Sequence, residues 1–313
     1  MKPAPFAYTA PTGLDEALDA LAGGDAKVLA GGQSLLPLLS MRLVTPDRLV
    51  DINRLPGLGA VTATAPAATG APGVLVGALA RHAAVAADPV VGSLTPLVAE
   101  ALRLVGHPAI RNRGTSLGSI VHADPAAELP AVTLLLGGQV HARSRAAGER
   151  VIPAAQLYVG PLQSALRADE LATAVWLPGL PPRTGTAVDE VSRRRGDYAL
   201  VGVAGLVGLD DDLRVADARA AYFSVDVVPV LLDLTDAVAG ASYDAADWPA
   251  AGRAAQARTD PGEDIHATAA YRRQLVGVLT RRVLATAAAR AADATVRGAG
   301  VGAPAAAARG ARP

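Results

Sequence analysis

The chain of 313 residues contains no cysteine. This absence excludes disulfide bonds, thiolate metal sites, an iron–sulfur cluster bound through cysteine of this chain, and a cysteinyl link to a flavin. Aromatic residues make up only 3% of the chain, which we attribute, together with its abundant alanine, to genomic base composition. The 29 basic and 29 acidic residues cancel, so no excess of one sign favours nucleic acid or a membrane surface as a partner.

Long hydrophobic runs are missing as well. No apolar run reaches the roughly 18 residues of a membrane span, so no span is expected. Residues 1–6 lack the apolar segment of a signal peptide. Because a chain without disulfides is compatible with a reducing compartment, we expect a cytoplasmic protein.

The most informative motif is the run Leu-Ala-Gly-Gly-Gln-Ser at residues 29–34, which precedes a helical pattern of leucines over residues 35–43. Glycine at positions 31 and 32 permits positive φ angles and lets an anion approach main-chain N–H groups without a Cβ in the way. Ser34 can cap the following helix and donate its hydroxyl to the same anion. When this motif stands alone, a plain strand-to-helix turn with an N-cap serine is the simpler interpretation.

A proline-rich break over residues 178–182 is the best candidate for a domain boundary. Before the break, residues 1–177 are expected to form one domain with subdomains of about residues 1–55 and 56–177. The first of these alternates between helical and strand patterns. Residues 178–292 are expected to form a second domain.

Beyond the break, strand patterns are followed by apolar patterns that we interpret as helices near residues 228–239 and 271–292. The last residues, 293–313, are rich in Ala, Gly, Arg and Pro. Such a composition offers little to bury, so a disordered tail is expected there.

A second motif lies in residues 106–128, which show no helical or strand period before residue 125. Long ordered loops are often functional. Its polar side chains are donors suited to a pyrophosphate and carboxylates suited to ribose or ribityl hydroxyls, namely Asn112, Thr115, Ser116 and Ser119, then Asp124 and Glu128. The run Gly-Thr-Ser-Leu-Gly at residues 114–118 also matches a hydrolase nucleophile pattern, but that elbow needs a strand before it and a helix after it, and the flanks here are aperiodic.

A third motif, Arg-Arg-Arg-Gly-Asp-Tyr-Ala-Leu-Val at residues 193–201, places an acid and an aromatic at the entry of a strand. The three motifs in this order resemble the FAD-binding medium subunit of the molybdenum hydroxylases, the group of xanthine dehydrogenase and carbon monoxide dehydrogenase. The resemblance runs from about residue 5 to residue 290 and is nearest to the carbon monoxide dehydrogenase type.

This resemblance implies an α+β fold, with a p-cresol-methylhydroxylase-type FAD-binding domain of two α/β subdomains and a C-terminal α+β domain. It implies that two loops clasp the FAD pyrophosphate, and that other matched positions lie along the rest of the cofactor. The implied cofactor-binding residues are Ala30, Gly31, Gly32, Gln33, Ser34, Thr115, Ser116, Leu117, Gly118, Ser119, Asp124, Glu128 and Leu171. Asp197 and Tyr198 match the place beside the isoalloxazine ring and are the implied catalytic residues.

The resemblance also implies a role and partners. The chain would pass electrons from [2Fe–2S] clusters on a small partner subunit, through FAD, to an external acceptor. A large partner subunit would hold the molybdopterin cofactor, in a dimer of heterotrimers. The substrate and the acceptor, whether NAD, quinone, dioxygen or a cytochrome, stay open.

One position departs from the family pattern. The family's second loop usually runs Thr-Ile-Gly-Gly-Ser, whereas residues 115–119 read Thr-Ser-Leu-Gly-Ser. If position 117 requires a positive φ, leucine costs about 1–2 kcal/mol there. This departure motivates an alternative function, a structural or assembly subunit with an impaired FAD site. A stand-alone flavin oxidoreductase is a third interpretation.

Overall fold

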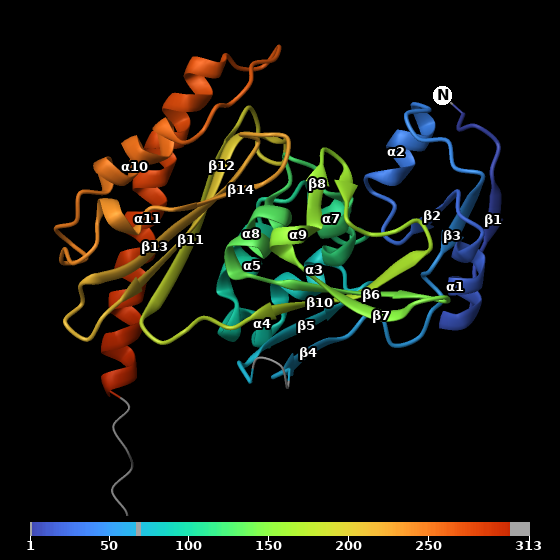
Figure 1. Cartoon of the computed structure of the whole chain (residues 1–313), viewed down its shortest axis with the longest axis horizontal. Coiled ribbons are helices and arrows are strands. Elements are labelled where there is room, and N and C mark those ends of the chain that lie inside the picture. The colour runs from blue at the N-terminus through green and yellow to red at the C-terminus, as the bar shows by residue number, and fades with distance from the viewer. Residues whose placement is uncertain (1, 67–69, 301–313) are drawn as a thin grey trace, which may run out of the picture.

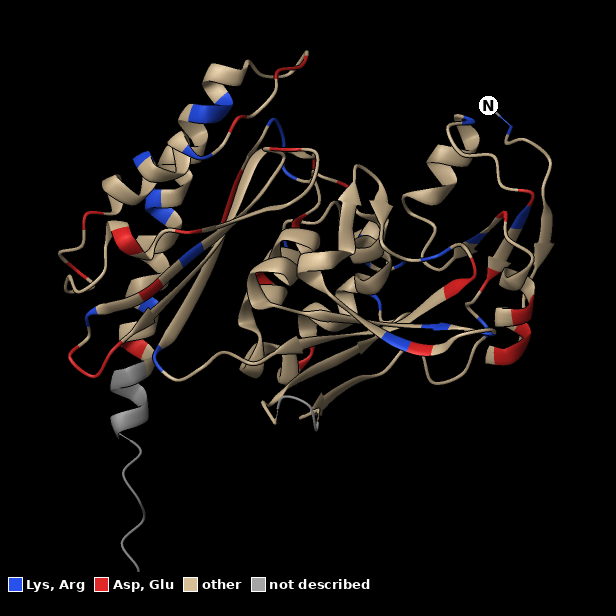
Figure 2. Cartoon of the chain, viewed as in Figure 1, with Lys and Arg blue, Asp and Glu red and all other residues tan. Residues whose placement is uncertain are grey.

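The structure is a computed structural model that describes residues 2–66 and 70–300. Its main sheets follow one another along the chain, and Figure 1 shows the three resulting units side by side, from the blue N-terminal unit to the orange and red C-terminal helices. Within the described residues, no helix is both long enough and apolar enough to cross a membrane. Basic and acidic residues are interspersed over all three units in Figure 2.

The first unit is a parallel three-stranded sheet in the order β1-β3-β2. Its elements are β1 (Ala7–Thr9), α1 (Leu14–Ala22), β2 (Ala26–Leu29), α2 (Leu35–Ser40) and β3 (Arg48–Asp51). Helix α1 buries Ala17, Leu18 and Leu21, which recur at helical spacing and therefore lie on one face. The unit agrees with the alternating helix and strand patterns of residues 1–55.

The second unit is an antiparallel five-stranded sheet in the order β4-β5-β10-β6-β7, with helices packed against it. Its strands are β4 (Val61–Thr64), β5 (Gly73–Gly77), β6 (Gln139–Ser144), β7 (Gly148–Pro153) and β10 (Glu170–Pro178), and β8 (Tyr158–Gly160) pairs with β9 (Gln163–Ser164). Its helices are α3 (His82–Ala87), α4 (Pro89–Leu94), α5 (Pro96–Leu102), α6 (Pro108–Arg111), α7 (Ser116–His122), α8 (Glu128–Leu136) and α9 (Ala154–Leu157).

The third unit is an antiparallel sheet in the order β11-β12-β13-β14, with the long helix α11 along its outer face (Figure 1). Its elements are β11 (Thr184–Ser192), β12 (Ala199–Leu209), β13 (Val215–Phe223), β14 (Val230–Asp233), the short 3-10 helix η1 (Thr235–Ala237), α10 (Trp248–Ala257) and α11 (Ala269–Gly300).

Strand β12 is buried on both faces and joins two hydrophobic cores. Val203 and Val207 pack into the core beneath α11, whereas Ala204 and Leu206 pack into the core of the second unit. Because successive side chains of a strand point to opposite faces, one strand serves both cores. The third unit is therefore fastened to the second through a shared core.

Two predicted features differ from the structure. Residues 293–300, expected to begin a disordered tail, continue α11, because alanine and arginine favour helix and Ala287, Ala288 and Ala291 of the same helix are fully buried. The rest of that predicted tail, residues 301–313, lies outside the described residues. Residues 228–239 are not a helix: they contain the strand β14, which pairs with β13, and the η1 turn.

The shared core predicts a large cost for shortening Leu206, a side chain that is 4% exposed. We expect Leu206→Ala to lower the free energy of unfolding by about 2–5 kcal/mol, the usual range for a buried leucine. The matched control is Leu231→Ala on β14, the edge strand of the same sheet, where the side chain is 38% exposed and the loss should be much smaller. Chemical denaturation of both variants measures the difference, and equal losses would contradict the two-sided burial of β12.

Candidate functional site

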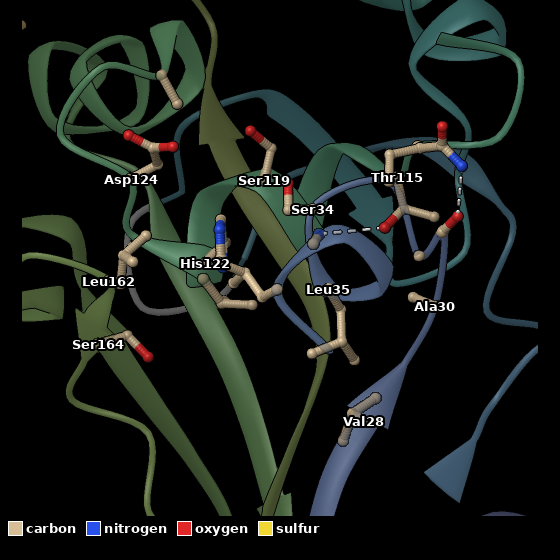
Figure 3. A pocket seen from close by; sticks show the side chains of 18 of the residues that line it. Val28, Ala30, Ser34, Leu35, Thr115, Ser119, His122, Asp124, Leu162 and Ser164 are labelled. Carbon is tan, nitrogen blue, oxygen red and sulfur yellow. Dashed lines mark hydrogen bonds between the residues drawn. The ribbon is translucent and has the colours of Figure 1, made fainter. Parts of the chain in front are cut away.

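A cavity of about 590 Å³ lies where the three units meet. Figure 3 shows Ser34 from the first unit, Thr115 and Ser119 from the second, and Asp124 around this space. Twelve of the predicted site residues line it: Ala30, Gly31, Gly32, Gln33, Ser34, Thr115, Gly118, Ser119, Asp124, Glu128, Asp197 and Tyr198. The two loops and the hairpin of the third motif, which are far apart in the sequence, thus meet at one site.

The two glycines of the first loop have different roles. Gly32 has φ +72°, a conformation that favours glycine. Gly31 is needed for space, because a Cβ there would lie 2.5 Å from the carbonyl oxygen of Arg113 and 2.7 Å from the Cα of Gly114. Gly31 does not use the positive φ that glycine permits, and its missing side chain lets the first loop pack directly on the second.

The hydroxyl of Ser34 is not used to cap a helix. Ser34 stands at the N-cap position of α2, but its φ and ψ of −94° and −41° are already helical and its side chain makes no capping hydrogen bond. Gln33 instead folds its side-chain amide back onto the carbonyl oxygen of Gly31, at 3.1 Å. The predicted capping role of Ser34 is wrong, and its hydroxyl is left beside the cavity.

The second loop is not an aperiodic segment, because it contains α6 and opens α7. Thr115 is the N-cap of α7, and its Oγ1 accepts a hydrogen bond of 3.2 Å from the main-chain N–H of Gly118 (Figure 3). Ser119 lies one turn into the helix and faces the cavity. Short helices like these leave little period in the sequence, and the threonine cap is the local signal for the start of α7.

The structure does not bring three of the predicted residues to the cavity by their side chains. Leu117 and Leu171 are each 1% exposed and belong to the core of the second unit, and Ser116 is 2% exposed. Leu117 lies inside α7 and is not among the described residues with positive φ, so leucine causes no backbone strain there. Any contact of Ser116 or Leu117 with a ligand would have to come from the main chain.

The hydrolase interpretation of Ser116 fails on geometry. A helix does follow Ser116, but a helical turn, α6, and not a strand precedes it. Its buried Oγ lies 3.3 Å from Nδ1 of His82, and burial, with the nearby Arg111 charge, lowers the pKa of His82 to about 4. The pair is a buried polar contact, and Ser116 itself is not part of the cavity wall, although His82 is.

Two carboxylates form another part of the cavity wall. Asp124 accepts a hydrogen bond of 2.9 Å from the N–H of Ala126, which holds the turn between α7 and α8. Glu128 begins α8, and burial together with the charge of Asp124 raises its pKa to about 7. The pKa of the Tyr198 hydroxyl is raised as well, through partial burial and through its proximity to Asp124 and Glu128.

The third motif supplies the loop between β11 and β12. Gly196 adopts φ +84°, and a Cβ there would lie 2.7 Å from Cε1 of His107, so this loop packs closely on the second unit. Asp197 is held by Arg194 at 3.1 Å and Arg193 at 3.7 Å. Tyr198 is 68% exposed at the cavity wall.

Glu190 is a titratable residue near the site that the motifs did not indicate. Its Oε2 is buried without a hydrogen-bond partner in the described part of the chain. Burial and the neighbouring charges of Glu128 and Asp189 raise its pKa to about 8. The only signal in the sequence is an acid near the end of an apolar strand pattern, and the proximity to Glu128 depends on how the units pack.

Sequence reasoning also missed part of the cavity lining. Polar residues add to the wall, namely Lys27, His122, Gln163, Ser164 and Arg167, and apolar side chains such as Val28, Leu35 and Leu162 complete it. Burial lowers the pKa of His122. Only His122 falls within a motif, that of residues 106–128, and no local pattern could have identified the others. Hydroxyl donors, main-chain N–H groups and carboxylates around one cavity are the chemistry of a site for a phosphate-bearing cofactor.

The chain matches two protein families. Residues 4–180 match the FAD binding domain in molybdopterin dehydrogenase, and residues 186–287 match the CO dehydrogenase flavoprotein C-terminal domain. It is 40% identical to the 6-hydroxypseudooxynicotine dehydrogenase complex subunit alpha of Paenarthrobacter nicotinovorans, covering 93% of this chain and 97% of that one. It is 32% identical to the carbon monoxide dehydrogenase medium chain of Hydrogenophaga pseudoflava, covering 93% of this chain and 100% of the other.

Solved structures agree. Quinoline 2-oxidoreductase from Pseudomonas putida 86 superimposes with a TM-score of 0.86 at 35% identity, over 93% of this chain and 99% of that one. Carbon monoxide dehydrogenase from Hydrogenophaga pseudoflava superimposes with a TM-score of 0.84 at 32% identity, over 93% of this chain and 99% of that one. The chain belongs to the FAD-binding medium subunits of molybdopterin hydroxylase complexes, of the carbon monoxide dehydrogenase type. The predicted family, the α+β fold with its C-terminal domain, and the assignment to an oxidoreductase complex are confirmed.

The raised pKa of Glu190 predicts a pH-dependent stability. The folded chain holds this proton more tightly than the unfolded chain, so the associated stability is full below about pH 4.5 and is lost as the pH rises through about 8. Glu190→Gln keeps a neutral side chain at every pH. The melting temperature of Glu190→Gln, relative to the unsubstituted protein, should therefore rise between pH 5 and pH 8.5.

The control for this experiment is Glu263→Gln, at an exposed position of the third unit. Comparing each variant with the unsubstituted protein at the same pH removes the contributions of titrating groups that do not interact with Glu190, His82 and His122 included. A difference for Glu190→Gln that stays constant with pH would contradict the burial of a proton at Glu190.

Proposed function

We propose that the cavity holds FAD with its pyrophosphate between the two loops. The residues facing it there are Ala30, Gly31, Gly32, Gln33 and Ser34 from one loop and Thr115, Gly118 and Ser119 from the other, with Ser116 and Leu117 contributing main chain only. The carboxylates of Asp124 and Glu128 would accept hydrogen bonds from ribityl or ribose hydroxyls. Asp197 and Tyr198 would lie beside the isoalloxazine ring, and Leu171 would support that region from the core.

The close contact of the loops at Gly31 is the observation that carries this proposal. It brings Ser34, Thr115 and Ser119 to one part of the cavity, and there is no acid in residues 29–34 or in residues 115–119. An anion is favoured where hydroxyl and main-chain N–H donors converge and carboxylates are absent. The cavity of about 590 Å³ also lies within the usual range for cofactor sites, roughly 300–1,000 Å³.

The alternative of a structural or assembly subunit rested on Leu117. Its side chain packs in the core of the second unit and does not enter the cavity. Its place inside α7 also removes the need for a positive φ. The structure therefore offers no steric reason for an impaired site, and we favour the FAD-binding function.

We further propose that the chain serves electron transfer within its complex. Bound FAD would supply the chemistry, taking up two electrons and two protons and returning them to an acceptor. The donors would be [2Fe–2S] clusters of a small partner subunit, since this chain has no cysteine, and a large subunit would hold the molybdopterin cofactor. Tyr198 would cover one face of the ring, and the ion pairs of Asp197 with Arg193 and Arg194 would hold that loop in place.

The finer organisation is part of the same proposal. Residues 1–177 would form the FAD-binding domain and residues 178–292 the C-terminal domain, which the two family matches support. A dimer of heterotrimers is the assembly we propose. The cytoplasmic location stays a prediction.

The FAD proposal is tested by titrating the purified chain with FAD and following the flavin absorbance and fluorescence. The unsubstituted chain should bind FAD. Gly31→Ala should raise the dissociation constant for FAD about 10- to 100-fold. A Cβ at this position would meet main-chain atoms and force the loops apart, at a cost of about 1–3 kcal/mol of binding free energy. Gly23→Ala is the matched control, because a Cβ at Gly23 meets nothing within 4 Å. A chain that stays colourless with FAD, alone and in its complex, would favour the structural-subunit alternative.

The electron-transfer proposal is tested in the assembled complex. Substrate should still reduce the iron–sulfur clusters of a complex that carries Gly31→Ala, because those clusters lie on another chain. Transfer to the acceptor should fall in parallel with the FAD content, and added FAD should restore part of it. Acceptor reduction that is independent of FAD content would contradict the proposed route.

A further inference from the structure

A chain of side-chain hydrogen bonds behind the cavity joins the main chains of the two loops. Asn53, two residues after β3, donates from Nδ2 to the carbonyl oxygen of Ala30 at 2.8 Å. Arg81 donates to Oδ1 of Asn53 at 2.6 Å and, through its other terminal nitrogen, to the carbonyl oxygen of Arg113 at 2.6 Å. Two side chains therefore connect Ala30 of the first loop to Arg113 at the start of the second.

The Asn53 end of this connection is anchored in the first unit. Nδ2 of Asn53 also donates to Oδ1 of Asp51, at 2.6 Å, and the main-chain N–H of Asn53 donates to the same oxygen at 2.9 Å. The other carboxylate oxygen of Asp51 accepts from the hydroxyl of Tyr8 at 2.7 Å. These bonds fix the orientation of the Asn53 amide relative to β1 and β3.

The Arg81 end is anchored in the second unit. The residues on either side of Arg81 pair with the second loop: the N–H of His82 donates to the oxygen of Gly114 at 3.0 Å, and the oxygen of Ala80 accepts from the N–H of Ser116 at 3.1 Å. Arg81 is thus held against the second loop by its backbone and reaches the first unit with its side chain.

The carbonyl oxygen of Arg113 takes part both in the close packing at Gly31 and in the hydrogen bonds that join the loops. The oxygen of Arg113 is the atom that a Cβ at Gly31 would meet at 2.5 Å, and it is also the acceptor for Arg81. The missing side chain of Gly31 lets the loops come together, and the bonds of Arg81 and Asn53 keep them from moving apart. Neither Asn53 nor Arg81 lines the cavity, so neither acts by touching a ligand.

Arginine suits this place for a chemical reason. Its planar guanidinium presents several N–H donors in a fixed fork, so one side chain can hold two acceptors at a set separation. Its charge strengthens both bonds relative to neutral donors. Lysine, a single flexible ammonium, could keep the charge but not the two-acceptor geometry.

We propose that Arg81 and Asn53 are positioning residues that set the separation of the two loops and thereby the affinity for the cofactor. This inference rests on the proposed function, in which the pyrophosphate lies between those loops. It assigns a role to two residues that no motif indicated and that lie outside the cavity.

The experiment measures FAD dissociation constants for the full chain with Arg81→Gln, Arg81→Lys, Asn53→Ala and the double variant Arg81→Gln/Asn53→Ala. Each single variant should weaken FAD binding about tenfold, the scale of a lost charge-assisted hydrogen bond. The double variant should bind little worse than either single variant, because both changes break the same connection. Arg48→Gln is the matched control, since Arg48 also bonds to a carbonyl in the first unit, that of Ala20 at 3.3 Å, but joins no loops.

Melting temperatures of the FAD-free variants separate positioning from general stability. We expect the Arg81 variants to melt close to Arg48→Gln while differing from it in FAD affinity, and Arg81→Lys to resemble Arg81→Gln. Unchanged FAD affinity in both Arg81 variants, or losses that multiply in the double variant, would overturn the proposal while leaving the FAD-binding function intact. Failure of the unsubstituted chain to bind FAD would instead overturn the function and the positioning role together.

Discussion

The contact between the two loops at Gly31 is the constraint on which the site depends. The loops belong to different units, one following β2 of the parallel sheet and the other opening α7 of the second unit. A single methyl group at Gly31 would meet the main chain of Arg113 and Gly114, where there is no flexible side chain to move aside. The donors on the two loops therefore converge only because this one side chain is missing.

The third unit reaches the same cavity by a different physical route. Its sheet is fastened by β12, whose alternate side chains enter two cores. The burial of Ala204 and Leu206 against the second unit places the hairpin that begins β12, and with it Asp197 and Tyr198, at the cavity wall. Apolar packing of β12 thus contributes to the placement of a highly exposed tyrosine, together with the close contact of Gly196 with His107.

The sequence was sufficient to predict those parts of the structure that depend on residues close together in the chain. Glycine, serine and threonine at the turns identified both loops, and the alternating helix and strand patterns of residues 1–55 agree with the first unit. The prediction from sequence failed where pairing between distant segments determines the secondary structure. Residues 228–239 have an apolar pattern compatible with a helix, but they contain the edge strand β14, because β13 offers a pairing partner. Glu190, Arg81 and Asn53 could not be found for the same reason, because their roles arise from neighbours far away in the chain.

The departure at Leu117 shows why a motif alone cannot separate main-chain from side-chain roles. Read as a string, leucine in a glycine-containing loop suggests an obstructed site. In the folded chain that position lies on the far side of α7 from the cavity, where the core selects an apolar side chain, while Thr115 and Ser119 face the cavity. In a helix, residues three or four positions apart lie on the same face. The residues between the ones that face the cavity are therefore free to change with the packing of the core. The identity of residue 117 is therefore set by packing in the second unit, and it can change without altering the hydroxyls that face the cavity.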